Sequence, residues 1–138
     1  MFAATVNAKT GGGRQFVIGE FGDDTETRWR QTIGAGLTAL ASDLTMSADG
    51  TYLVSATISD TTGQAGLVVN FSSDGRILFA NRHAEDAEVQ ALAIAPRRPN
   101  GYALAGTSKR STGLDQDVWL LIRSGAEITG LTTQDTVP

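Results

Sequence analysis

The sequence predicts an all-β protein built from a repeat of about 50 residues. Three aromatic residues, Phe2, Tyr52 and Tyr102, lie 50 residues apart, and each begins an apolar run that reads as a β-strand. A second run of branched and aromatic side chains follows each of them, at Phe16–Phe21, Leu67–Phe71 and Val118–Ile122. Short strands repeated at such a period are typical of radial or pseudo-symmetric β architecture.

The middle unit shows the repeat most completely. Alternating, β-branched segments predict four strands there, at Tyr52–Ile58, Leu67–Phe71, Arg76–Asn81 and Ala91–Ala95. Residues 72–75 end in Asp-Gly, which favours a hairpin turn because glycine adopts positive φ. Residues 83–88 read as a polar loop. Four strands in about 50 residues match the content of one propeller blade.

The flanking units align with the middle one. The segment Phe21–Gln31 matches Phe71–Asn81 without a gap, which places Trp29 at the position of Phe79. We therefore predict one β-repeat domain over residues 1–138, with units at approximately 2–51, 52–101 and 102–138. The chain holds about 2.75 four-stranded antiparallel blades of a β-propeller, either partial or completed by oligomerisation. Trp29 and Trp119 are expected to fill space between blades.

Closure of the ring leaves an alternative open. Propellers need about 4–8 blades, and unpaired strand edges invite association with other strands. A β-trefoil closes with three four-stranded repeats and fits the total length. The propeller is favoured because only Leu131–Pro138 remains for the last strand of the third unit.

Two stretches resemble known propeller families. Leu44–Ala56, with Ser-Ala-Asp-Gly at its centre, resembles the first hairpin of WD-repeat blades. Asn100–Thr107, followed by Asp117–Ile122, is similar to bacterial tandem-repeat β-propellers, in which Asp74-Gly75 and Trp29 also occupy blade positions. The resemblance implies a rigid platform for binding and brings no catalytic residues with it.

Composition narrows the range of partners. The net charge is −4, from 11 basic and 15 acidic residues, which argues against nucleic acid because phosphate binding needs a basic face. The chain has no cysteine, so disulfides and thiolate metal sites are excluded. No apolar run approaches the ~20 residues that span a bilayer, so no membrane insertion is expected. The N-terminus shows no signal peptide, and the compartment stays open.

Loops that join the strands supply the predicted binding face. Five of them are expected to share one face of a propeller, at residues 8–14, 33–37, 60–64, 83–90 and 108–116. The candidate binding residues on that face are His83, Glu85, Asp86, Lys109, Arg110 and Asp115. His83, the only histidine, is interpreted as a solvated loop residue, so His83→Ala is expected to leave folding intact.

Pairs of acidic and of basic residues are the remaining candidates for binding a ligand. The carboxylates of Asp23-Asp24 and of Asp115 with Asp117 offer oxygen ligands to calcium, but neither pair has the spacing of a dedicated loop. The basic pairs Lys109-Arg110 and Arg97-Arg98 are expected on opposite faces and suit an acidic partner. No catalytic residue, metal or other cofactor is predicted.

The sequence thus predicts a non-catalytic scaffold or protein–protein interaction module that belongs to a larger assembly. Its partners are other proteins or copies of itself that cover the open blade edges. The alternative is a carbohydrate-binding module completed by oligomerisation, for which a glycan is the partner. A weaker alternative is a fragment of a propeller enzyme.

Overall fold

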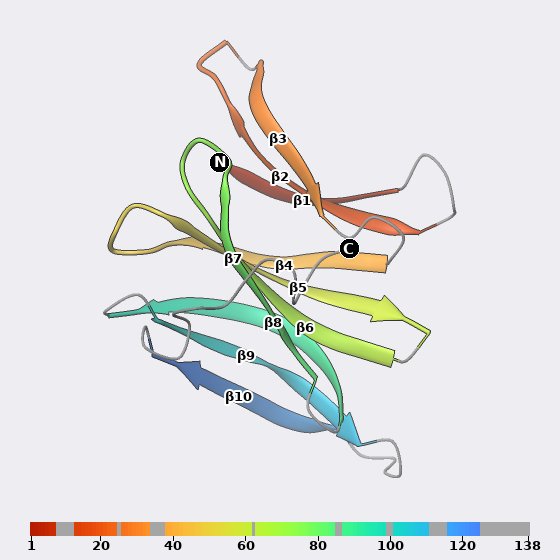
Figure 1. The fold of residues 1–138 in the computed structure, drawn as a ribbon. Coiled ribbons are helices and arrows are strands. Elements are labelled where there is room, and N and C mark those ends of the chain that lie inside the picture. Colours follow the sequence, from red (N-terminus) through yellow and green to blue (C-terminus); the bar gives the residue numbers. More distant parts are fainter. Residues whose placement is uncertain are drawn as a thin grey trace.

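The computed structural model describes residues 1–7, 13–24, 26–33, 38–61, 63–84, 87–98, 101–110 and 116–124. These residues form ten antiparallel strands in three sheets, and no helix occurs among them (Figure 1). The all-β prediction is confirmed.

The strands follow one another in chain order through the three sheets. Sheet A contains β1 (Phe2–Asn7), β2 (Arg14–Phe21) and β3 (Thr27–Ile33), in the order β1-β2-β3. Sheet B contains β4 (Thr38–Met46), β5 (Tyr52–Asp60), β6 (Gly63–Phe71) and β7 (Ile77–His83), in the order β4-β5-β6-β7. Sheet C contains β8 (Ala87–Arg97), β9 (Gly101–Arg110) and β10 (Asp117–Arg123), with β9 in the centre.

The four strands predicted for the middle unit are confirmed, and all four extend further than predicted at one end or both. The prediction of a polar loop over residues 83–88 is wrong at both ends. Strand β7 continues to His83, and β8 already begins at Ala87. The strand continues because the His83 side chain is buried, as described below.

Some backbone features of the described residues lie 50 positions apart. Strand β3 begins at Thr27 and β7 at Ile77. The first strand of sheet B has a bulge between Ala41 and Asp43, and the first strand of sheet C has one between Ala91 and Ala93. A bulge leaves a backbone group without its ladder partner, so another group has to satisfy it.

Threonine hydroxyls from the preceding sheet supply that partner at both bulges. The backbone N–H of Ala41 donates to Thr5 Oγ1 at 3.1 Å, and that of Ala91 donates to Thr57 Oγ1 at 3.0 Å. Thr5 lies on β1 and Thr57 on β5, the first strand of sheet A and the second strand of sheet B. The junctions between consecutive sheets are therefore built on a similar plan.

Sheet B lies between sheets A and C, and each junction holds a hydrophobic core (Figure 1). The first core joins sheets A and B, with Phe16 and Ile18 from β2 against Val54, Leu67 and Val69 from β5 and β6. The second core joins sheets B and C and contains Leu53, Val68, Ala91, Ile94, Tyr102 and Leu104. Trp29 packs against the first core and Trp119 against the second, as expected from the sequence.

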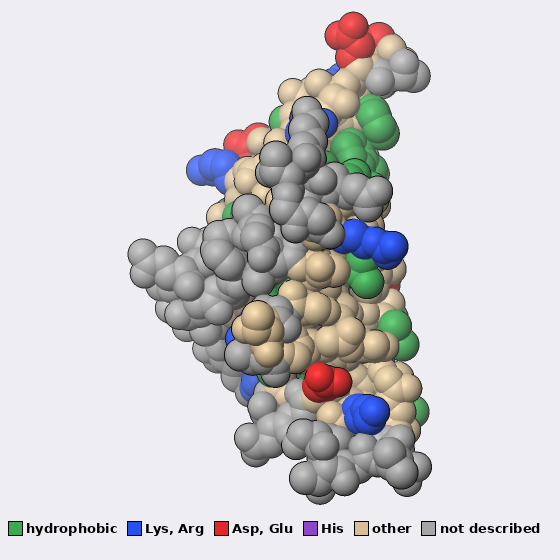
Figure 2. All heavy atoms as spheres, turned by 90° about the vertical axis from the view of Figure 1, so that its right-hand side faces the viewer, with side chains coloured by type: hydrophobic (Ala, Val, Ile, Leu, Met, Phe, Trp, Pro, Cys, Tyr) green, Lys and Arg blue, Asp and Glu red, His purple; other side chains and the backbone are tan. Residues whose placement is uncertain are grey.

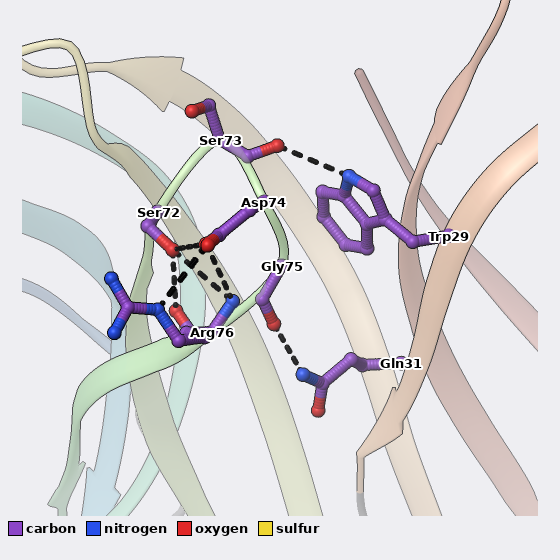
Figure 3. A network of polar contacts seen from close by, with 7 residues as sticks. All are labelled: Trp29, Gln31, Ser72, Ser73, Asp74, Gly75 and Arg76. Carbon is purple, nitrogen blue, oxygen red and sulfur yellow. Dashed lines mark hydrogen bonds and ion pairs between the residues drawn. The ribbon is translucent and has the colours of Figure 1, made fainter.

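A turn of sheet B also contacts sheet A directly (Figure 3). The indole Nε1 of Trp29 donates to the carbonyl oxygen of Ser73 at 3.1 Å, and the Gln31 amide donates to the carbonyl of Gly75. Gly75 has a φ of 89°, which a residue with a Cβ adopts only at a cost. A Cβ at this position would lie 2.6 Å from the Trp29 ring, so glycine is required twice over.

Candidate functional site

The structure describes only part of the predicted binding face. Glu85, Asp86 and Asp115 lie outside the described residues, and for Arg110 only its place as the last residue of β9 is described. Lys109 is exposed on β9, where it pairs in register with Glu88 of β8. The basic pairs lie at opposite ends of the β8–β9 hairpin, because Lys109 pairs with Glu88 at one end and Arg97 pairs with Gly101 at the other.

The side chain of His83, the last residue of β7, points into the protein. It is buried at the junction of sheets B and C, so its interpretation as a solvated loop residue is wrong. Its Nε2 lies 2.7 Å from the Tyr102 hydroxyl, which also accepts a hydrogen bond of 3.0 Å from Asn81 Nδ2. The imidazole ring also lies beside Trp119, with 6.3 Å between ring centroids.

This environment keeps the imidazole neutral. Burial and, to a smaller extent, the positive charge of Arg123 together lower the pKa of His83 to about 4. The Tyr102 hydroxyl accepts from Asn81 and still has its own hydrogen to donate to an unprotonated Nε2. Such a group holds two sheets together and is not available to a ligand in solution.

A cavity lies at the end of the β8–β9 hairpin where Arg97 pairs with Gly101. Its volume is about 780 Å³, and its lining comes from two turns 50 residues apart: Met46, Ser47, Ala48 and Asp49 from the β4–β5 side, and Pro96, Arg97 and Arg98 from the β8–β9 side. Hydrogen bonds from Thr51 lower the pKa of the Asp49 carboxyl group, so it stays ionised. The site combines two guanidinium groups and one carboxylate in an open hollow, which suits contact with polar or acidic groups.

A smaller hollow of about 380 Å³ lies at the β2–β3 turn, lined by Asp23, Asp24, Glu26, Thr27 and Arg28. Figure 2 shows acidic side chains gathered at this tip of the molecule, with exposed hydrophobic side chains below it, at the level of sheet A. Among the described residues no group of three or more His, Asp or Glu side chains is arranged to hold a metal ion.

Hydrophobic side chains are exposed on the outer strand of sheet C. Val118 is 90% exposed, Leu120 63% and Ile122 48%. They alternate with Trp119 and Leu121, which pack against the second core, so the three point to the opposite side of the sheet. Val118, Leu120 and Ile122 thus form an exposed aliphatic face on the outermost described strand of sheet C.

Sequence reasoning missed both the cavity at residues 46–49 and 96–98 and the exposed face of sheet C. The cavity had a signal, because its two turns occupy equivalent positions in consecutive repeats and one of them carries Arg97-Arg98. The exposed face had none, because Val118–Ile122 reads as a continuous apolar run without a polar side.

No protein-family model matches this chain, and no curated protein is significantly similar to it. In the described part of the chain there is no helix of the length and hydropathy that a membrane crossing requires. The function therefore has to be argued from the geometry alone.

Proposed function

We propose that this chain is a non-catalytic, β-propeller-like scaffold, a protein–protein interaction module that works as a subunit of a larger assembly. The observation that carries the proposal is the exposed aliphatic face of β10, the outermost strand of sheet C among the described residues. Burying such side chains contributes about 25 cal/mol per Å² of apolar area, which favours association with another protein.

The sheet topology supports the same proposal. Sheet B has four strands, whereas sheets A and C each have three among the described residues. Compared with sheet B under the predicted repeat, the described residues provide no strand beside β1 in sheet A and none beside β10 in sheet C. Unpaired strand edges offer backbone donors and acceptors to a further strand, so partner proteins or copies of the chain suit both ends of the stack.

The proposal is tested by the native size of the chain in extracts of the cells that make it. We expect the wild-type chain to elute well above its own mass of 14.5 kDa. The double variant Val118→Lys/Leu120→Lys places charges on the exposed face and is expected to elute at the mass of the free chain. Leu78→Lys is the control, because Leu78 is also apolar and exposed, at 44%, but lies on β7. Elution of the wild-type chain at 14.5 kDa would contradict the proposal.

One observation favours a second candidate, a carbohydrate-binding module. Phe21 is 54% exposed, stacks on Phe2 with 4.6 Å between ring centroids, and lies beside the polar hollow at residues 23–28. An exposed aromatic face next to polar groups suits a sugar ring. Binding of the purified chain to a glycan array, lost in Phe21→Ala and kept in Leu78→Lys, would favour this candidate over the scaffold.

A further inference from the structure

The three sheets present equivalent faces in the same direction. We call front face the face of each sheet that carries Phe2, Tyr52 or Tyr102, and back face the opposite one. The front face of sheet B covers the back face of sheet A, because Tyr52 packs against the core formed with Phe16 and Ile18. The front face of sheet C covers the back face of sheet B, because Tyr102 packs in the second core and bonds to His83.

Two faces therefore remain uncovered by another sheet of the described chain, the front face of sheet A and the back face of sheet C. In each junction within the chain, a front face covers a back face. The front face of sheet A is therefore of the kind that covers, and the back face of sheet C is of the kind that is covered.

The register identifies what the back face of sheet C is built to contact. Leu120 pairs with Ala105 of β9, and Val68 pairs with Ser55 of β5, so Leu120 and Val68 occupy equivalent positions. Val68 is fully buried because the front face of sheet C lies over it, whereas Leu120 is exposed. By this equivalence, the front face of another such sheet would cover Leu120.

The front face of sheet A has the matching character. Phe2 and Phe21 stack on it, and Val6 is also exposed there. Val17 pairs with Ala4 as Val69 pairs with Val54, and Val69 is buried in the first core, while Val17 is itself only 7% exposed. Aromatic and aliphatic side chains thus occupy the positions that form cores elsewhere in the chain.

We propose that copies of this chain associate head to tail, with the back face of sheet C in one copy packed on the front face of sheet A in the next. The inference rests on the proposed function as an interaction module and names its partner. A second copy is the partner because the two uncovered faces are the two halves of a junction that the chain already makes twice. Two copies bring six sheets together, within the 4–8 blades at which propellers close.

A heterologous contact of this kind either closes into a ring or continues into a filament. The solution mass decides between them. We expect light scattering during size-exclusion chromatography to give a discrete multiple of 14.5 kDa, with twice that mass for a closed ring of six sheets.

Two variants that each block one face test the geometry. Val118→Lys/Leu120→Lys blocks the back face of sheet C, and Phe21→Lys blocks the front face of sheet A. Each junction needs one face of each kind, so each variant alone is expected at 14.5 kDa. An equimolar mixture retains one intact junction, between the sheet A of the first variant and the sheet C of the second. The mixture is therefore expected to form a dimer and nothing larger.

The substituted side chains are all exposed, and circular dichroism and thermal unfolding verify that the variants stay folded. Leu78→Lys is again the control and is expected to assemble as the wild type does. A wild-type monomer would overturn the inference, as would a Phe21→Lys variant that still assembles or a mixture that stays monomeric. If the purified chain is monomeric but the native size in cell extracts is large and depends on Val118 and Leu120, self-association fails while the proposed function stands.

Discussion

The Tyr102 hydroxyl lies 2.7 Å from Nε2 of His83, across the junction between sheets B and C. One repeat earlier, the position of His83 is occupied by Ile33, which is buried in the first core. The chain thus joins one pair of sheets with an aliphatic side chain and the next pair with a buried, titratable one.

The buried His83 makes folding stability depend on pH. Its pKa is about 4 in the folded state, against the ordinary 6.5 of an unfolded chain, because of burial and the Arg123 charge. The unfolded state therefore binds a proton more readily. Above pH 6.5 the neutral His83 makes its full contribution to the free energy of unfolding. Between pH 6.5 and 4 the free energy of unfolding falls by about 3 kcal/mol.

Urea unfolding at a series of pH values checks this expectation. In His83→Gln the slope between pH 6.5 and 4 is expected to disappear, although the variant is less stable at pH 7. The carboxyl groups of Asp49 and Asp74, whose pKa values are lowered, lose their contribution only as the pH falls below 3.8 and so lie outside this window. An equal slope in the variant would rule out His83 as its source.

Tyr102→Phe is expected to destabilise the fold by about 1–3 kcal/mol, because it removes the hydroxyl that Asn81 and His83 contact in a buried site. The matched control is Tyr52→Phe, the equivalent residue one repeat earlier. Its ring stacks on Phe71, and its hydroxyl makes no hydrogen bond to another described residue, so a change within about 0.5 kcal/mol is expected. Thermal unfolding measures both, and equal effects would contradict the assignment.

Comparing Gly75→Ala with Gly50→Ala separates the cost of a positive φ from the cost of a steric contact with Trp29. Both glycines have positive φ, 89° and 82°, so alanine costs about 1 kcal/mol at either turn. Space around Gly50 is open, whereas a Cβ on Gly75 would meet the Trp29 ring. We expect Gly75→Ala to cost at least about 1 kcal/mol more than Gly50→Ala in chemical denaturation. Equal losses would show that Trp29 does not constrain this turn.

Trp119→Ala is expected to destabilise the fold by about 2–3 kcal/mol, less than the ~3–5 kcal/mol of a fully buried tryptophan. The side chain packs against the second core but is half-buried on an edge strand. Asp117→Ala, exposed on the same strand, serves as the control and is expected to stay within about 0.5 kcal/mol of the wild type. An unchanged melting temperature of Trp119→Ala would show that Trp119 does not contribute to the core.

The candidate site was less predictable than the strands. The polarity of the residues around His83 predicted a loop, which is wrong for His83 itself, whereas Glu85 and Asp86 lie outside the described residues. A single histidine in a polar stretch carries no local sign of burial. Its burial depends on Tyr102, which lies 19 residues further along the chain and in another sheet.

The sequence by itself determined that this is an all-β chain and where most of its described strands lie. These properties follow from local alternation, turn residues and spacing, which one segment carries without reference to the others. Only the tertiary structure decided which side of each strand is covered. Leu120 and Leu121 are adjacent and chemically identical, yet one is exposed and the other packs in the second core. The difference arises because sheet B lies against one face of sheet C, and that stacking joins residues about 50 positions apart.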